Sequence, residues 1–196
     1  VAKTVSPPGR GMATMARYAN VLFDFDYTLA DSSPGIIESV NWAFASLGMA
    51  DRSEAAIRRT IGLSLRDTFA ALVDDERSAT ENDAALFVER FVGRADEVMA
   101  DATSLLPGAR EAVAALADTG ATLAVVSTKF RRRIESVLAR EELREPFSVI
   151  VGGEDVTAHK PDPACLFAAC AALEASPSEC VYVGDSVVDG QAADAA

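Results

Sequence analysis

The 196-residue sequence has few of the side chains on which metal and nucleophile chemistry often depends. It contains one histidine, His159, and its three cysteines show no C-x-x-C spacing. A zinc site built on several histidines is therefore excluded, and a Ser-His-Asp triad would depend on His159 alone. The cysteines stand in apolar segments and are expected to be buried free thiols in a reducing compartment: Cys165, Cys170 and Cys180.

Lysine is also scarce, and acidic side chains outnumber basic ones. Three of the 18 basic residues are lysines, and 30 acidic residues give a formal net charge of −12. This charge opposes binding to nucleic acid or to an anionic membrane, so neither is expected as a main partner. No apolar run approaches the roughly 18 residues of a membrane helix, and residues 1–17, expected to be a flexible leader, lack the apolar region of a signal peptide. We therefore expect a cytoplasmic location, and the oligomeric state is left open.

Short apolar strands alternate with helical patterns over much of the chain. Strands are expected at residues 20–25, 121–127, 147–151 and 180–183. The alternation predicts an α/β fold with a Rossmann-like, doubly wound parallel sheet. Between the first two strands only helical patterns occur, at residues 35–47, 53–60, 64–73 and 78–99, which predicts an all-helical cap inserted after the first strand.

The expected domains are a core at residues 18–32 and 105–196 and a helical cap at residues 33–104. The aromatic residues of the cap fall at helical spacing and are expected to pack in its interior: Trp42, Phe44, Phe69, Phe87 and Phe91.

Polar side chains follow each of the four predicted strands. Because ligands of doubly wound sheets gather at the carboxyl ends of the strands, these side chains are expected to meet at one edge. Asp24 and Asp26 would share a face if the first strand continued through them. In strand order the polar residues are Asp24 and Asp26, then Ser127, Thr128 and Lys129, then Lys160, then Asp185 and Asp189.

Such a cluster of acids predicts a cation. Carboxylates in close contact repel by about 4 kcal/mol per pair at an effective dielectric constant near 20. All-oxygen ligands beside a phosphate favour Mg²⁺. One carboxylate can then attack phosphorus, and another, two residues on, can exchange protons with the leaving oxygen and with water. Hydroxyl, backbone N–H and lysine groups would hold the phosphate oxygens.

Four segments resemble, in order and spacing, the motifs of the haloacid dehalogenase-like hydrolase superfamily. They are DFDYTLADS at 24–32, VSTK at 126–129, HKPD at 159–162 and GDSVVD at 184–189. The resemblance implies that Asp24 is the nucleophile and Asp26 the general acid/base. It further implies that Ser127, Thr128 and Lys160 hold the phosphate. Mg²⁺ would be bound by Asp24, Asp185 and the backbone carbonyl of Asp26. Asp189 would act indirectly, by orienting the lysine or another group of the site.

The helical insertion resembles the cap of the subclass that contains phosphoglycolate phosphatase, pyrophosphatase and β-phosphoglucomutase-like enzymes. Residues 60–65, TIGLSL, resemble its specificity loop. Two features depart from the pattern. Tyr27 stands where the family usually has glycine, and it is expected to narrow the entrance or alter the turn. The sequence also stops at Ala196, before a strand and helix that the family adds, so this part of the core is expected to be missing.

Several alternatives are weighed against a phosphatase. Dehalogenases lack an acid at the position of Asp26, and residues 32–106 contain no lysine, which excludes a phosphonatase that forms a Schiff base. A pyrophosphatase or a phosphomutase stays open. A receiver-type phospho-acceptor is disfavoured because acids recur after Lys160 and a long insertion intervenes. A catalytically silent binding protein is disfavoured because every motif residue is present.

Substrate choice is expected to depend on the cap. Three arginines flank the loop at Gly62, and an arginine fork pairs well with a carboxylate or a second phosphate; otherwise these arginines are solvated helix charges. They are Arg58, Arg59 and Arg66. The leading expectation is a small phosphorylated metabolite with a carboxylate, such as phosphoglycolate, with pyrophosphate and sugar phosphates close behind.

Overall fold

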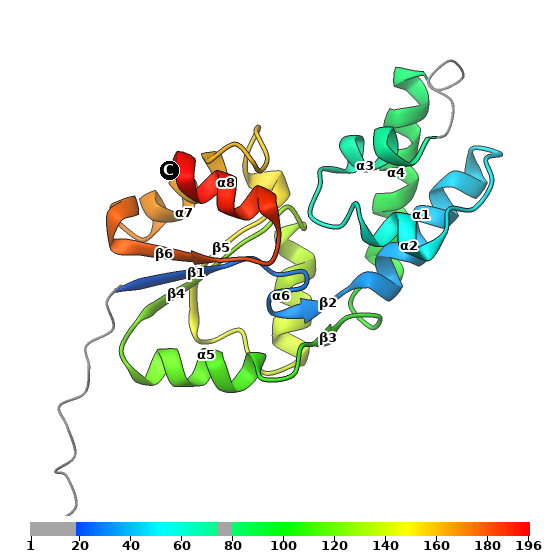
Figure 1. The fold of residues 1–196 in the computed structure, drawn as a ribbon. Helices are drawn as coiled ribbons and strands as arrows, with labels where there is room; N and C mark the ends of the chain where they lie inside the picture. The colour runs from blue at the N-terminus through cyan, green and yellow to red at the C-terminus, as the bar shows by residue number, and fades with distance from the viewer. Residues whose placement is uncertain (1–18, 74–79) are drawn as a thin grey trace, which may run out of the picture.

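A computed structural model describes residues 19–73 and 80–196 (Figure 1). The expected leader at 1–17 and the expected helix start at 78 lie outside these residues. The core is a parallel sheet in the order β5-β4-β1-β6, which confirms the predicted doubly wound arrangement. Its strands are β1 (Asn20–Phe23), β4 (Thr122–Val126), β5 (Phe147–Val151) and β6 (Cys180–Val183).

Helices cover both faces of this sheet (Figure 1). One face packs against α5 (Ala109–Asp118) and α6 (Arg131–Arg140), through a cluster that includes Val113, Ile134 and Leu138. The other packs against α7 (Ala164–Ala172) and α8 (Val187–Ala195). Two short 3₁₀ helices, η1 (Gly153–Asp155) and η2 (Pro177–Glu179), lie in the connecting segments. Because β1 and β4 are buried on both faces, they are uninterrupted apolar runs.

The register of the sheet brings the strand ends together. Phe23 at the end of β1 is level with Val125 of β4 and with Val183 of β6. The chain therefore leaves three neighbouring strands at the same edge. β1 ends at Phe23, two residues earlier than predicted, because Phe25 O accepts hydrogen bonds from the backbone of Leu29 and Ala30 in a tight turn.

The helical insertion follows β2 (Ala30–Asp31) and ends before β3 (Ser104–Leu105). It consists of α1 (Ser33–Ser46), α2 (Glu54–Arg58), α3 (Leu65–Leu72) and α4 (Glu81–Val98). Three of these helices begin with a side-chain cap, in which Ser53, Ser64 or Thr80 accepts a hydrogen bond from the third residue beyond it. The predicted cap boundaries, at residues 33 and 104, remain predictions.

The strands β2 and β3 were not expected from the sequence. They pair antiparallel, with Ala30 opposite Leu105 and Asp31 opposite Ser104. Two residues per strand are too few to produce an alternating apolar pattern, so no periodicity announces them. This ladder joins the two chain crossings between the core and the helical insertion at one place (Figure 1).

Phenylalanines fill the interior of the helical insertion. The ring of Phe44 lies 5.8 Å from that of Phe69 and 5.1 Å from that of Phe87, and Phe91 extends the cluster. The expectation for Trp42 is wrong, since its side chain is 55% exposed and lies under the guanidinium of Arg94. Two residues along a helix correspond to about 200°, so Trp42 and Phe44 point to nearly opposite sides of α1.

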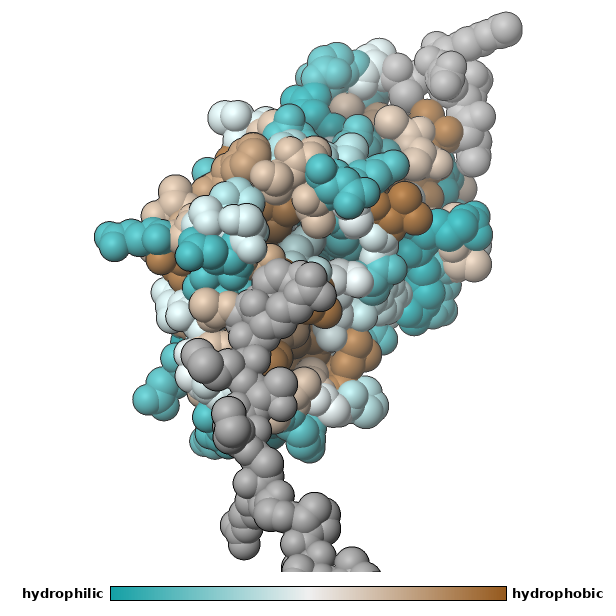
Figure 2. Space-filling model, turned by 60° about the vertical axis from the view of Figure 1, so that its left-hand side comes forward, coloured by the Kyte–Doolittle hydropathy of each residue, from teal (hydrophilic) through white to brown (hydrophobic). Residues whose placement is uncertain are grey.

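Apolar and polar residues are interspersed on the molecular face drawn in Figure 2. Among the described residues, the exposed large apolar side chains besides Trp42 are Phe167, Val183 and Val187. Among the described helices, none has both the length and the apolar character that crossing a membrane requires. All three cysteines are free, as expected, but only Cys165 and Cys170 are buried, because Cys180 begins the half-buried strand β6.

Replacing Phe44 should destabilise the helical insertion far more than replacing its neighbour Trp42. Phe44 is fully buried among other rings, so Phe44→Ala should lower the free energy of unfolding by about 3–5 kcal/mol. Trp42→Ala, at an exposed position, should cost less than about 1 kcal/mol. Urea denaturation followed by circular dichroism measures both values, and equal losses would contradict this packing.

Candidate active site

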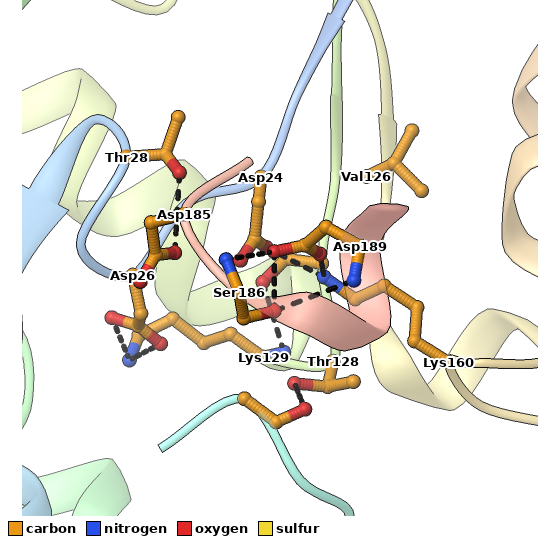
Figure 3. Close-up of polar contacts among 12 residues, drawn as sticks. Asp24, Asp26, Thr28, Val126, Thr128, Lys129, Lys160, Asp185, Ser186 and Asp189 are labelled. Carbon is orange, nitrogen blue, oxygen red and sulfur yellow. Dashed lines mark hydrogen bonds and ion pairs between the residues drawn. The ribbon is translucent and has the colours of Figure 1, made fainter. Parts of the chain in front are cut away.

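Four loops meet at the carboxyl edge of the sheet and bring their polar side chains together (Figure 3). Asp24 and Asp26 come from the turn after β1, Lys129 from the loop after β4, and Lys160 from the segment between β5 and α7. Asp185 and Asp189 come from the loop after β6 and the first turn of α8. The structure therefore gathers the acids and the lysine that the sequence predicted to share one edge.

Asp24 is the most deeply buried acid at this edge apart from Asp189. Its backbone N–H donates to Val183 O at 2.8 Å, which continues the pairing of β1 with β6. Its Oδ1 lies 3.2 Å from Lys160 Nζ yet accepts no hydrogen bond from the described residues. Burial raises the pKa of Asp24 to about 6, although Lys160 opposes the shift. Oδ1 of Asp24 is thus ion-paired with Lys160 but has no hydrogen-bond donor among the described residues.

Lys160 connects three parts of the site. Its ammonium contacts Asp24, the carboxylate of Asp189 and the hydroxyl of Tyr182, the last at 3.0 Å. Tyr182 in turn donates to Val126 O at 2.9 Å. Burial lowers the pKa of Lys160, but Asp24 and Asp189 together outweigh burial and raise it overall. Lys160 is therefore a fixed cation beside Asp24.

Asp189 has both a local and a tertiary role. Its Oδ2 accepts hydrogen bonds from the backbone N–H and hydroxyl of Ser186, forming the capping box that starts α8. Its Oδ1 contacts Lys160. Burial raises the pKa of Asp189, but Lys160 and Ser186 outweigh burial and lower it. Gly184 is required beside it, because a Cβ there would lie 2.5 Å from Asp189 Cγ.

The acids fit a hard divalent cation. Carboxylate oxygens of Asp24, Asp185 and Asp189 lie within 4.8 Å of one another. Oδ1 of Asp24 accepts no hydrogen bond from the described residues, and the carboxylate of Asp185 accepts one, from Thr28 at 3.4 Å. Both carboxylates therefore have capacity left for a metal. Both oxygens of Asp189 are already engaged. This donor set matches the oxygen ligands that Mg²⁺ prefers.

The carboxylate of Asp26 points to a different partner from that of Asp24. Lys129 Nζ lies 3.1 Å from Asp26 Oδ2 and 3.2 Å from Oδ1, and both side chains are almost completely buried. Because β1 ends at Phe23, Asp24 and Asp26 lie in the turn that follows it. They therefore do not share a strand face. Figure 3 shows the two carboxylates on opposite sides of Asp185.

Ser127 and Thr128 follow β4, as predicted. Ser127 is buried, its hydroxyl accepts a hydrogen bond from the N–H of Lys129 at 3.3 Å, and it lowers the pKa of Asp24. Thr128 donates from its hydroxyl to Gly62 O, in the helical insertion, at 3.3 Å. Ser127 therefore lies beside Asp24, whereas Thr128 contacts the helical insertion.

Tyr27 adopts a backbone conformation typical of glycine. Its φ is +60°, in the left-handed region, which explains why a glycine suits this position. The hydroxyl of Tyr27 accepts a hydrogen bond from Arg58 Nη1 at 2.8 Å, and the same nitrogen donates to Ser33. The side chain thus links the turn that carries Asp24 to α2.

The structure does not bring the three cap arginines together as a fork. Arg58 contacts Tyr27, Ser33 and Glu54; Arg66 pairs with Glu81; Arg59 is exposed. A cavity lies between the core and the helical insertion, but these arginines do not line it. Their role in binding substrate remains a prediction without support from this cavity.

Two residues of this site were not assigned a role from the sequence. Lys129 lies in the motif-like segment VSTK. The available signal was that it is one of only three lysines in the sequence. Tyr182 lies in an apolar strand, CVYV, which reads as core sequence alone. Its hydroxyl, a polar group that requires a partner when buried, was the signal there.

Taken together, a doubly wound sheet with an inserted helical unit and an edge of acids around a lysine define a hydrolase of the phosphoryl-transfer type. Comparison with known proteins agrees with this class. Residues 21–196 match the sequence model of the haloacid dehalogenase-like hydrolases, and the chain belongs to this family.

Two relatives and a solved structure are similar over most of the chain. A phosphoglycolate phosphatase of Chromobacterium violaceum is 34% identical, covering 90% of this chain and 80% of its own length. A phosphoglycolate phosphatase of Haemophilus influenzae is 32% identical, covering 89% and 80%. A crystal structure of a protein from Bacteroides fragilis, named as haloacid dehalogenase-like hydrolase, has 38% identity and a TM-score of 0.85, covering 91% and 84%.

Asp24→Asn should stabilise the metal-free protein above pH 6. In the folded state the pKa of Asp24 is raised from 3.8 to about 6, so the folded protein binds this proton more tightly than the unfolded chain. The stability associated with that proton is complete below about pH 4 and is lost as the pH rises to about 6. The loss is on the order of 3 kcal/mol, and asparagine avoids it.

Thermal unfolding in a chelator from pH 4 to 8 measures this difference between Asp24→Asn and the original chain. Adding Mg²⁺ at pH 7.5 should raise the Tm of the original chain and leave that of the variant nearly unchanged. If the difference in stability between Asp24→Asn and the original chain does not vary with pH, burial of the Asp24 carboxylate does not carry the expected cost.

Proposed function

We propose that this protein is a magnesium-dependent phosphatase that cleaves a small, phosphoglycolate-like phosphate monoester in the cytoplasm, through an aspartyl-phosphate intermediate. The observation that carries the proposal is the buried carboxylate of Asp24, whose Oδ1 lies beside Lys160 and accepts no hydrogen bond from the described residues. The names of its relatives support phosphoglycolate as the substrate. Three free cysteines are consistent with a reducing compartment.

In the first step the Asp24 carboxylate attacks phosphorus. The bond from phosphorus to the ester oxygen breaks, and Asp26 gives its proton to that leaving oxygen. Lys160 and the hydroxyl of Ser127 lie beside Asp24, where they can hold the phosphate oxygens as charge redistributes during transfer. The products of this step are the free alcohol and a phosphorylated Asp24.

In the second step water attacks phosphorus on the other side. Asp26, now a carboxylate, takes the proton of that water, and the bond between phosphorus and the Asp24 oxygen breaks. Phosphate leaves, and Asp24 returns to its carboxylate form. Asp26 therefore acts as the acid first and as the base second, so its position on the cavity side of the turn suits both tasks.

Asp24, Asp185 and the backbone carbonyl of Asp26 would hold Mg²⁺, with Asp189 fixing Lys160 beside them. When bound, Mg²⁺ neutralises charge on the transferring phosphate and reduces its repulsion of the Asp24 carboxylate. Without a cation, the acids of this edge are balanced only by Lys160 and Lys129 among the described side chains that contact them.

Asp24→Asn should abolish hydrolysis of p-nitrophenyl phosphate with Mg²⁺ present. The amide cannot attack phosphorus, so kcat should fall about a thousandfold or more. Asp118→Asn, which changes an exposed acid at the end of α5, is the matched control and should retain full activity. A steady-state assay checks both, and substantial turnover by Asp24→Asn would exclude this nucleophile.

Asp26→Asn should separate the two steps. An aryl leaving group departs without a proton, so the first step proceeds, but the second lacks its base. A phosphoryl group should therefore accumulate on Asp24, detectable by mass spectrometry after an acid quench. The companion variant Asp24→Asn/Asp26→Asn should show none. If the phosphoryl group is found at another residue, the intermediate is assigned wrongly.

A further inference from the structure

The cavity between the core and the helical insertion differs in character from the phosphate site. Its walls are largely apolar, from Ile36, Val40, Leu63 and Phe91 of the insertion and Phe130 of the core. Asp26 is among the residues that line it. Among the described residues that line this cavity, Lys129 and Arg133 carry positive charge. Both come from the core segment after β4 and not from the insertion.

Lys129 is fixed where a leaving group would lie. Its Nζ is within 3.2 Å of both Asp26 oxygens and 5.9 Å from the centre of the Phe25 ring. Its backbone is held by Gly153, whose N–H donates to Lys129 O at 3.0 Å. Because Asp26 exchanges its proton with the leaving oxygen, a cation that contacts Asp26 borders the leaving group and not the transferred phosphate.

Arg133 adds positive charge to the same cavity. Its guanidinium is buried and donates to Asp96 Oδ1 at 2.9 Å and to Val92 O at 3.0 Å, both on α4. Asp96 also accepts two hydrogen bonds from Arg132. Asp96 therefore pairs with two guanidiniums, and of these that of Arg133 lines the cavity.

We propose that Lys129, with Arg133 adding to the positive potential, selects substrates whose short leaving group carries a second anionic group. This inference rests on the proposed function. Two buried cations between apolar walls, which strengthen charge pairing by excluding water, suit an anionic leaving group better than a neutral one. It transfers the expected selectivity from Arg58, Arg59 and Arg66 of the insertion to the core, next to the general acid/base.

The test compares phosphoglycolate with glycolamide phosphate, which has nearly the same shape and a neutral end. The original chain should have a kcat/KM about tenfold or more higher for phosphoglycolate, the size expected of one charge-assisted hydrogen bond. Lys129→Met should remove this preference, mainly through KM, and Lys129→Arg should keep most of it. Ethylene glycol bisphosphate, as a second probe, tells whether a phosphate replaces the carboxylate.

Two further variants locate the effect. Arg131→Met removes an exposed cation, two residues after Lys129, that does not line the cavity, and it should leave the preference unchanged. Loss of the preference in Arg66→Met, with Lys129→Met still selective, would overturn the inference. An equal loss on both esters in Lys129→Met would also overturn it, because Lys129 would then act only by positioning Asp26.

The comparison of the two esters in the original chain keeps the inference testable even if Lys129→Met fails to fold. Equal kcat/KM values for the two esters there would overturn it without any variant, while the proposed phosphatase function would stand. If neither these esters nor p-nitrophenyl phosphate is hydrolysed, the proposed function fails, and this inference fails with it.

Discussion

The site depends on one interaction, the contact of the Lys160 ammonium with the carboxylates of Asp24 and Asp189. These residues come from three separated segments, and each would be costly to bury alone. Tyr182 fixes the lysine further by linking it to the end of β4 through Val126 O. A single buried cation thus holds the segments after β1 and β5 and the first turn of α8 in a common arrangement, and this arrangement leaves an oxygen of Asp24 open to a ligand.

At the start of α8, the residues that cap the helix also take part in the cluster around Lys160. The capping box of Ser186 and Asp189 is what any helix beginning would favour, yet it also fixes the carboxylate that pairs with Lys160. Gly184 permits this because the loop passes so close to Asp189 that a side chain has no room. The segment GDSVVD therefore begins a helix and contributes to the cluster at the strand ends with the same side chains.

The sequence predicted the sheet, the inserted helices and the shared edge well, because continuous apolar runs and helical spacing reflect burial directly. The bounds of β5 and β6 agree with those expected. What it could not predict depends on the directions of side chains and on very short elements. Arg66 follows Leu65, which lines the cavity, but its own side chain pairs with Glu81. A long side chain can adopt either direction. The pairing of Lys129 with Asp26, 103 residues apart, likewise has no local signal.

Tyr27 gives the nucleophile turn a property that a glycine would not. Its hydroxyl is bonded to Arg58 of α2, so movement of the helical insertion away from the core must break a contact three residues from Asp24. The free energy of closing the insertion and that of keeping this turn in its left-handed conformation are therefore linked. By reciprocity, a ligand that orders the turn also favours the closed insertion, and a ligand gripped by the insertion helps to order the turn.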